Sequence, residues 1–384
     1  MLSTLLFTNN DMAAAAITEM LGESNVLSVV LRTSPTLPVY EIIRLSKTYD
    51  PHVILLDSNN LKDAAFITQQ IRATPQLRAV IIGFRPGWTP AEELALQNQG
   101  MQGMLPEPFG WKELEPVVYD SIHQRQSIHQ KKFLAFLPAK AGGGCSTVAL
   151  NTAGALAGLG KRVLLMDSDR RSGIISVLLN LTKRNGLLDA LRNSSELTGV
   201  EWERNVVRAL GMDLLLADPA VNNVVPTWAD YYLLLRFLDA QYDQIVIDLP
   251  ELVNPATVEV VRSAGSVFVV CTPEIPSLRL AEQRCRELAS CGIPETNVHI
   301  LLNRETREGM KMDAIQRLVG RPVFATLSND YAAVHESILA SRLVAADSAF
   351  SKGCQQLARR AAGLEPAEQA VSRFGFLRAF SLAS

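Results

Sequence analysis

Short apolar runs alternate with amphipathic segments along the first 125 residues of the chain. Each run ends in small or polar residues, and the segments between the runs repeat apolar residues at helical spacing. Strands that alternate with helices pair in parallel, so this block predicts a doubly wound α/β sheet. The expected strands are 5–7, 26–31, 53–56, 80–82 and 101–105, and the expected helices are 11–21, 39–48, 62–73, 91–98 and 111–122.

The same alternation returns after a polar stretch. Residues 121–132 (SIHQRQSIHQKK) predict the end of a helix that runs into a linker over 126–132, with a continuous helix between the two blocks as the alternative. We therefore expect two doubly wound parallel-sheet domains, residues 1–125 and 133–364, followed by a tail over 365–384. The expected strands of the second domain are 133–137, 162–166, 213–216, 244–247, 266–271 and 297–302.

Composition narrows the class of protein. Thirty-seven basic and 39 acidic residues give a net charge of −2, which argues against binding nucleic acid through bulk charge. The five cysteines form no CxxC pair and the five histidines are scattered, so neither a disulfide framework nor a zinc site is expected. The N-terminus lacks the pattern of a signal peptide, and no apolar run is long enough to span a membrane. These features predict a soluble protein of the cytoplasm.

The segment from residue 133 to residue 147, FLAFLPAKAGGGCST, predicts a phosphate-binding loop. An apolar strand leads into three consecutive glycines, and an alanine-rich helix follows. Backbone N–H groups in such a turn, together with the helix N-terminus, can surround an anion, and the Ser146 hydroxyl stands where it could bind Mg²⁺. The pattern GxxxxGK followed by Ser or Thr fails at two positions, where Ala139 replaces the first glycine and Cys145 replaces the lysine.

The run from Lys140 to Thr147 resembles the deviant Walker A loop of MinD/ParA-type ATPases, Lys-Gly-Gly-x-Gly-Lys followed by two Ser or Thr residues. It departs from that loop at Ala141 as well as at Cys145. The resemblance implies that Lys140 reaches across a nucleotide-sandwich homodimer into the partner's site, as a catalytic and nucleotide-binding residue. It also implies that ATP phosphates bind to Gly142, Gly143, Gly144, Cys145, Ser146 and Thr147.

Two further segments resemble the same family. KRVLLMDSD, which ends at Asp169, is similar to the second strand with its DxD signature. The resemblance implies that Asp167 supports Mg²⁺ and its water shell and that Asp169 positions the attacking water. YDQIVIDLP, which contains Asp248, is similar to the Walker B strand that ends in DxP, and a carboxylate there can hold a magnesium-bound water. Ser146, Asp167 and Asp248 are thus the candidate metal site.

The fourth segment, LLNR, ends in Asn303 and Arg304 and resembles the strand-end pair whose asparagine reads the adenine edge. The four motifs occur in the family's order and cover most of residues 133–345, which implies a P-loop NTPase fold of the MinD/ParA (SIMIBI) class with ATP and Mg²⁺ as cofactors. Each motif also has a simpler interpretation. The glycine loop could be a tight turn without a ligand, the aspartates could cap helices or turns, and Asn303 could stabilise a turn.

The loss of the loop lysine separates nucleotide binding from turnover. A charge-assisted contact contributes roughly 1.5–3 kcal/mol, and positive charge near a transferring phosphoryl group matters more in the transition state. Cys145 cannot supply that charge. Backbone amides, Mg²⁺ and the partner's lysine remain, so binding of ATP is expected while hydrolysis is weak or absent. Cys145 could be a reactive thiol at a helix N-terminus, but a small neutral substitute is the favoured interpretation.

Residues 1–125 resemble the receiver domain of response regulators. VILLD, which ends at Asp57, is similar to the strand with the phospho-acceptor aspartate, and GMQGMLPEPF is similar to the fifth strand and its ending. The family's lysine is Glu107 here, and its acidic pair falls on Asn9 and Asn10, or on Asn10 and Asp11 after a shift by one. The switch hydroxyl is also missing, since its position falls on Gly83 or Phe84. This degenerate receiver is expected to be a docking or dimerisation module in which the aspartate is not phosphorylated.

The tail carries an apolar group. Phe374, Phe376, Leu377 and Phe380 would share one broad face of a helix, into which Arg373 also points. Some MinD-like relatives end in a short amphipathic helix that touches the membrane. Contact with the membrane surface, packing against the protein's own domain or a partner, and a frayed end are the three interpretations.

A degenerate receiver joined to a MinD/ParA-type domain resembles the TadZ/CpaE branch of pilus-assembly proteins, and residues 327–338 (LSNDYAAVHESI) are similar to that branch's stretch before the last helix. The resemblance implies a homodimeric localisation factor for tight-adherence (Flp/type IVc) pilus or related secretion machinery, at a pole or peripheral at the inner membrane. Two alternatives are a scaffold that ignores nucleotide and a ParA/MinD-like partition or positioning ATPase. The near-neutral charge weighs against DNA binding by the latter.

Overall fold

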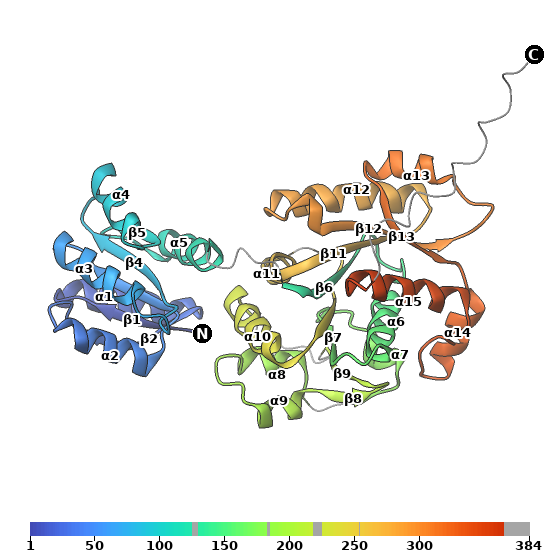
Figure 1. The fold of residues 1–384 in the computed structure, drawn as a ribbon, viewed down its shortest axis with the longest axis horizontal. Coiled ribbons are helices and arrows are strands. Elements are labelled where there is room, and N and C mark those ends of the chain that lie inside the picture. The colour runs from blue at the N-terminus through green and yellow to red at the C-terminus, as the bar shows by residue number, and fades with distance from the viewer. Residues whose placement is uncertain (125–129, 183–184, 218–224, 253, 365–384) are drawn as a thin grey trace, which may run out of the picture. The chain divides into compact units, whose positions relative to one another are not determined.

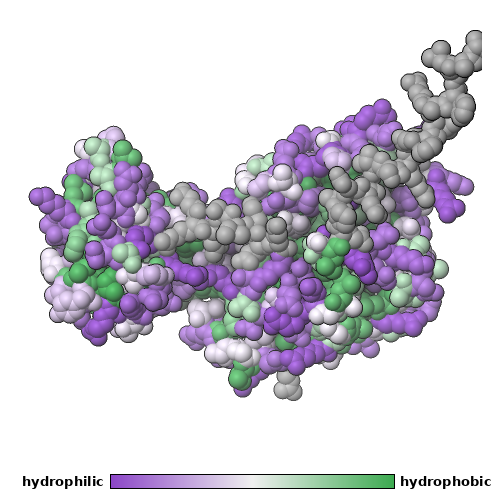
Figure 2. All heavy atoms as spheres, viewed as in Figure 1, coloured by the Kyte–Doolittle hydropathy of each residue, from purple (hydrophilic) through white to green (hydrophobic). Residues whose placement is uncertain are grey.

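The structure is a computed structural model of the 384-residue chain, and it describes residues 1–124, 130–182, 185–217, 225–252 and 254–364. The chain divides into two compact units (Figure 1). The first comprises Met1–His129 with the short segments Ser194–Glu196 and Val225–Leu234, and the second comprises the remainder. In both units the visible surface is mainly hydrophilic (Figure 2). None of the helices in the described ranges has the length and apolar character needed to cross a membrane.

The first unit contains a five-stranded sheet in the order β2-β1-β3-β4-β5, and all of its strand pairs are parallel. This is the flavodoxin-like strand order, in which the chain reverses direction across the sheet next to β1. The strands are β1 (Leu2–Phe7), β2 (Leu27–Thr33), β3 (Val53–Asp57), β4 (Val80–Arg85) and β5 (Gly103–Pro106).

Alternating side chains of these strands build two separate cores. Leu6 and Leu55 pack with α1 (Asp11–Ser24) and α5 (Trp111–Gln124) on one face of the sheet. Leu5 and Ile54, one residue earlier in each strand, face the other layer of helices. That layer consists of α2 (Val39–Tyr49), α3 (Leu61–Arg72) and α4 (Pro90–Asn98). The alternation of strands and helices predicted for this block is therefore confirmed.

The second unit contains an eight-stranded sheet in the order β13-β12-β11-β6-β10-β7-β9-β8. Its strand pairs are parallel except β8 with β9, which is antiparallel. The strands are β6 (Gln130–Pro138), β7 (Val163–Asp167), β8 (Val207–Ala209), β9 (Met212–Leu215), β10 (Gln244–Asp248), β11 (Ala264–Cys271), β12 (Val298–Glu305) and β13 (Val323–Ser328).

The start of β6 and the two edge strands differ from the sequence prediction. β6 begins at Gln130, so the end of the expected linker belongs to a strand and a helix does not continue through 121–132. The edge strands β8 and β13 were not predicted, because β8 has three residues and β13 is largely half-buried, so neither shows a continuous apolar run. The tail and its apolar group lie outside the described residues.

Helices cover both faces of this sheet (Figure 1). α6 (Cys145–Gly158) and α15 (Ala349–Ala361) pack together over one face, where Phe136 and Phe268 lie with ring centroids 5.1 Å apart. α11 (Pro255–Ser263) and α12 (Ile275–Ser290) pack against the central strands β6 and β11, with α13 beside α12. The other helices are α7 (Ile175–Leu178), α8 (Leu187–Arg192), α9 (Gly199–Asn205), α13 (Met312–Val319) and α14 (Tyr331–Leu339). α10 (Trp228–Gln241) begins in the segment assigned to the first unit and ends in the second.

Candidate phosphate and metal site

The motif residues of the second unit meet at the carboxyl ends of its central parallel strands. β6 leads into the glycine loop, and β7 and β10 end at Asp167 and Asp248. These two aspartates are direct neighbours in the register of the two strands. Ligand sites in open α/β sheets form at this edge. The structure therefore brings the loop together with Asp167, which follows about 20 residues later in sequence, and with Asp248, which follows about a hundred residues later.

The loop itself has the backbone of an anion cradle. Gly142 and Gly144 adopt the left-handed region, with φ of 78° and 84°, which glycine adopts without a steric penalty. A Cβ on Gly144 would lie 2.6 Å from Nδ2 of Asn303. Gly144 directly precedes α6, whose N-terminal N–H groups carry partial positive charge. This conformation fits phosphate groups and excludes larger side chains at Gly144.

Two side chains at the end of β12 support the loop. Asn303 Nδ2 donates to the carbonyl of Gly143 at 2.9 Å, and Arg304 Nη2 donates to the carbonyl of Gly142 at 2.9 Å. Asn303 is buried, so its amide is committed to the loop in this state. Adenine recognition by Asn303 stays a prediction, while the contact supports the simpler interpretation that it stabilises the turn.

Asp248 is a buried carboxyl with an unused acceptor. Burial raises its pKa to about 8, and the negative charge of Asp167 adds to this rise in pKa. Hydrogen bonds from the Ser146 hydroxyl and the Cys145 thiol lower the pKa but do not offset burial. Its Oδ1 has no hydrogen-bond partner among the described residues. A buried acceptor without a donor is costly, so this atom fits a bound water or a cation.

Asp167 is held on both oxygens by backbone amides. Oδ1 accepts from the N–H of Asp169 at 3.3 Å, and Oδ2 accepts from the N–H of Ile175 at 3.2 Å. Burial nonetheless raises its pKa to about 7, because the amides offset only part of the desolvation. Asp169 is less buried, and its Oδ1 caps the following turn by accepting from Arg171 and Ser172.

Two buried carboxyls with raised pKa favour a cation between or beside them. The described ranges contain no group of three or more His, Cys, Asp or Glu side chains that could hold a metal by themselves. Mg²⁺ commonly binds one or two carboxylates and completes its octahedron with waters and substrate phosphates. The residues present, Ser146, Asp167 and Asp248, therefore fit Mg²⁺ bound together with a phosphate group rather than a protein-only metal site.

Cys145 occupies the start of α6 with its thiol turned to Asp248. The side chain is 6% exposed, and burial followed by the negative charge of Asp248 raises the pKa of the thiol well above its usual value. A reactive thiolate needs the opposite surroundings. Of the two interpretations of Cys145, the small neutral substitute is the one that the geometry favours.

The remaining loop residues differ in exposure. Lys140 is exposed, and its carbonyl accepts from the N–H of Gly143 at 3.2 Å. Thr147 is partly buried on the first turn of α6, where its carbonyl accepts from Asn151. An exposed lysine at this edge is free to extend from the surface, which is what the bridging role across a dimer requires.

The sequence analysis missed Glu251, which lies in the turn after β10. Its Oε2 accepts from the N–H of Ala141 in the loop at 3.0 Å, and its Oε1 lies 3.9 Å from Nη2 of Arg284 on α12. A signal was present, because Glu251 directly follows the DxP motif. Its contact with Ala141 joins residues 110 positions apart in sequence, so only the folded structure reveals it.

In the first unit, Asp57 ends β3 and is bound within its own surroundings. Thr8 donates its hydroxyl to Oδ2 at 2.8 Å, and Asn59 donates from its N–H and its Nδ2 to Oδ1 at 3.1 and 2.8 Å. Asn10 caps α1 through Met12 N–H and Ala13 N–H, and Asn9 is exposed. These hydrogen bonds fix the orientation of the Asp57 carboxylate.

Glu107 stands where a working receiver has its lysine, and Gly83 or Phe84 stands where it has its switch hydroxyl. The hydroxyl that contacts Asp57 comes from Thr8, directly after β1. Burial raises the pKa of Glu107, and the negative charge of Asp57 raises that pKa further. At the switch position, a Cβ on Gly83 would lie 2.6 Å from the sulfur of Met101, so a larger residue does not fit without a shift.

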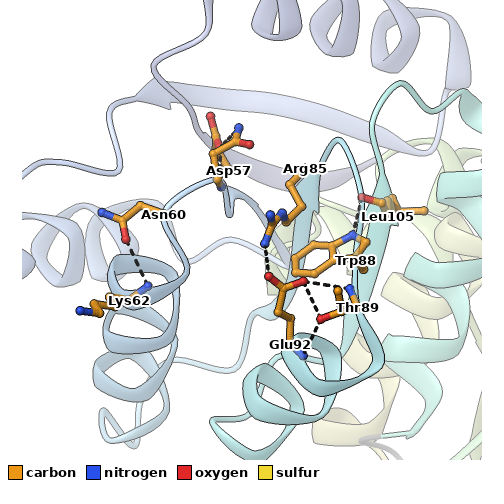
Figure 3. Close-up of polar contacts among 9 residues, drawn as sticks. Asp57, Asn60, Lys62, Arg85, Trp88, Thr89, Glu92 and Leu105 are labelled. Atoms are coloured by element: carbon orange, nitrogen blue, oxygen red, sulfur yellow. Dashed lines mark hydrogen bonds and ion pairs between the residues drawn. The ribbon is translucent and has the colours of Figure 1, made fainter.

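Arg85, the last residue of β4, belongs to a separate polar group with residues of α4 and the loop that precedes it (Figure 3). Arg85 Nη1 binds Glu92 at 3.0 Å, its guanidinium lies over the Trp88 ring, and Trp88 Nε1 donates to the carbonyl of Leu105 at 2.9 Å. Glu92 also completes a capping box with Thr89. These contacts join β4, the following loop, α4 and β5 at this end of the unit.

We expect incubation with acetyl phosphate and Mg²⁺ to add no phosphoryl group to Asp57. Glu107 stands where the receiver family has its lysine, so its carboxyl would repel the product phosphate on Asp57 instead of neutralising it. Intact-mass spectrometry of the wild type and of Asp57→Asn, side by side, checks this. An adduct present in the wild type and lost in Asp57→Asn would contradict the expectation.

Comparisons with known proteins support the fold of the second unit. Residues 131–289 match the AAA_31 family model, described as an AAA domain. The ParA family ATPase from Chlorobium tepidum superposes with a TM-score of 0.56 at 26% identity, over 60% of this chain and 98% of that one. The second unit has the fold of MinD/ParA-type P-loop ATPases. MinD from Pyrococcus horikoshii, solved with Mg-ADP, superposes with a TM-score of 0.52 at 21% identity, over 60% and 95% of the two chains.

Curated relatives are of the same type. The putative septum site-determining protein MinD of Oltmannsiellopsis viridis is 26% identical over 236 residues, which cover 58% of this chain and 73% of the relative. The antiactivator FleN of Pseudomonas aeruginosa is 28% identical over 171 residues, covering 41% of this chain and 56% of FleN. The match thus spans little more than half the length of FleN.

Proposed function

We propose that this protein is a dimerising localisation or assembly factor that binds Mg-ATP and hydrolyses it weakly or not at all. One observation carries the proposal. Asp248 Oδ1 is buried at the end of β10, beside the phosphate loop and the Ser146 hydroxyl, and no residue in the described part of the chain donates to it. An acceptor left open there is explained by a magnesium-bound water next to a bound phosphate.

In this proposal, separate residues bind phosphate, metal and water. The loop from Gly142 to Thr147 binds phosphates through backbone N–H groups and the N-terminus of α6. Ser146, Asp167 and Asp248 hold Mg²⁺, which neutralises phosphate charge when bound. Asp169 orients a water, and the exposed Lys140 contributes its charge to the site of a second copy. Each of these roles follows from the family resemblance and is compatible with the position of the residue.

Weak turnover follows from Cys145. Its thiol is turned to Asp248 and carries no charge, so the loop lacks the cation that would stabilise the transferring phosphoryl group. Binding depends on the amides of the loop, which are intact. ATP then acts as a ligand that stabilises the dimer rather than as a fuel consumed in each cycle.

The finer role is the positioning of tight-adherence (Flp/type IVc) pilus or related secretion machinery, at a pole or at the inner membrane. Relatives named for septum placement and FleN support a positioning role in general. The degenerate receiver and the segment around Asp330, which caps α14, are the features similar to the TadZ/CpaE branch. In this proposal the first unit is the docking module for assembly proteins.

A scaffold that ignores nucleotide is the second candidate, and Cys145 and Glu251 favour it. Cys145 places a neutral group where a cation is needed, and Glu251 places an anion on the loop. The scaffold would keep the fold and the dimer surface and lose the ligand.

Calorimetric titration with ATP, with and without Mg²⁺, decides between the two candidates. We expect saturable binding with a Kd of about 10 µM to 1 mM, which corresponds to roughly 4–7 kcal/mol, and tighter binding with Mg²⁺. Gly144→Val should abolish binding because its Cβ meets Asn303, whereas Gly158→Ala, in open space at the other end of α6, should not. The absence of binding up to millimolar ATP would favour the scaffold.

A further inference from the structure

Glu251 places a negative charge on the phosphate loop. Its carboxylate accepts from the N–H of Ala141, which directly precedes the three glycines. The side chain is 36% exposed, so it is not locked by packing. The contact shows that this N–H can bind an oxyanion, and that it is already occupied by one.

The buried guanidinium of Arg284 lies near the same carboxylate. Arg284 on α12 is 9% exposed, and its Nη1 binds Glu287 at 2.5 Å. Its Nη2 lies 3.9 Å from Oε1 of Glu251, which is longer than a direct hydrogen bond. Its Nε is buried and has no hydrogen-bond partner among the described residues. Arg284 therefore has donor capacity for a closer carboxylate.

We propose that Glu251 is a built-in competitor of the nucleotide phosphates. The proposal rests on the proposed function, because it concerns the loop that would bind ATP. One N–H cannot donate to a carboxylate and a phosphate at once, and two anions at this distance repel each other. An incoming phosphate thus displaces the carboxylate from Ala141 toward Arg284, where it completes a close ion pair.

This exchange gives the protein two discrete arrangements. With the loop empty, Glu251 links β10 to the loop; with the loop filled, Glu251 links β10 to α12. Nucleotide occupancy is thereby reported to α12, a helix of the face opposite α6 (Figure 1). The loss of the lysine at Cys145 and the presence of Glu251 act in the same direction, because both weaken the hold of the loop on phosphate.

Titration of Glu251→Gln with Mg-ATP, and separately with inorganic pyrophosphate, tests the proposal. We expect Kd to fall about three- to tenfold for both probes, since a charge-assisted contact to the competitor is weakened. The gain should shrink as ionic strength rises. Glu282→Gln is the matched control, because Glu282 is an acidic residue of similar exposure on α12 that pairs with Arg279 and Arg286.

Five results are distinguishable. Tighter binding in Glu251→Gln than in the wild type supports the competitor, as does binding by Glu251→Gln where the wild type shows none. Equal affinities of the wild type and Glu251→Gln overturn the competitor and leave the proposed function standing. An equal gain in Glu282→Gln overturns it in favour of a general charge effect. Absence of binding in all three proteins overturns both proposals. Glu251→Ala removes the carboxylate by truncating the side chain, and it must change Kd in the same direction as Glu251→Gln, which keeps the shape of the side chain.

Discussion

The nucleotide-free second unit is expected to lose stability as the pH rises from about 4 to about 8. The pKa of Asp167 is raised to about 7 and that of Asp248 to about 8, from an ordinary value of 3.8. Between these values the folded state binds more protons than the unfolded state, so the free energy of unfolding falls with rising pH. Between its unfolded and folded pKa values, each of the two carboxyls lowers the free energy of unfolding by about 1.4 kcal/mol per pH unit. For the pair, the loss amounts to several kcal/mol.

Asp248→Asn tests this directly, because an amide of the same shape cannot ionise. We expect the variant to unfold at higher denaturant concentration than the wild type at pH 8, by roughly 3–6 kcal/mol, and to match it closely near pH 4. The measurement is urea unfolding of the second unit across this pH range without Mg²⁺. The same variant should lose the stabilisation that Mg-ATP gives the wild type, since the metal-bound water has lost its carboxylate.

Asp243→Asn supplies a control of opposite sign. Arg162 lowers the pKa of this exposed carboxyl through a hydrogen bond, so its small contribution is present at neutral pH and is lost as the pH falls through its folded pKa. Replacing it should cost a little stability at pH 8 and none in strong acid. Parallel pH curves for Asp248→Asn and the wild type would show that burial of Asp248 does not govern stability.

Buried central strands of this fold could be predicted from the sequence, and the edge strands β8 and β13 could not. Central strands such as Val163–Asp167 are buried along their whole length, so they read as apolar runs and were predicted nearly to the residue. Val323–Ser328 lies at the edge of its sheet and alternates little, and its place is set by pairing with β12 rather than by its own pattern. Residues 207–209 are too few to carry a period at all.

The site divides in the same way. Local motifs predicted the aspartates, because the end of each parallel strand is marked in the sequence by a carboxylate after an apolar run. The contacts of Asn303 with the loop and of Glu251 with Ala141 join segments more than a hundred residues apart. Nothing local in the sequence records which loop atom a polar side chain will meet, so these contacts needed the structure.

Cys145→Lys is expected to raise the rate of Mg-ATP hydrolysis about a hundredfold, the order by which a preorganised charge at developing phosphoryl charge changes kcat. The new ammonium would stand at the start of α6, between the loop and Asp248. The backbone of the loop is already in the required conformation at Gly142 and Gly144, so the side chain is the missing part. Steady-state release of phosphate, measured with saturating ATP, checks the rate.

The charge must be distinguished from the length of the side chain. Cys145→Met extends the residue by a similar reach without charge, and it should leave turnover at the level of the wild type. In Cys145→Lys the ammonium also offsets the desolvation of Asp248, so the pKa of that carboxyl should fall and the loss of stability toward pH 8 should shrink. A rise in turnover without that change in pH dependence would mean that the lysine acts away from Asp248. Unchanged turnover would mean that the site lacks more than its lysine, and the protein would then act through binding alone.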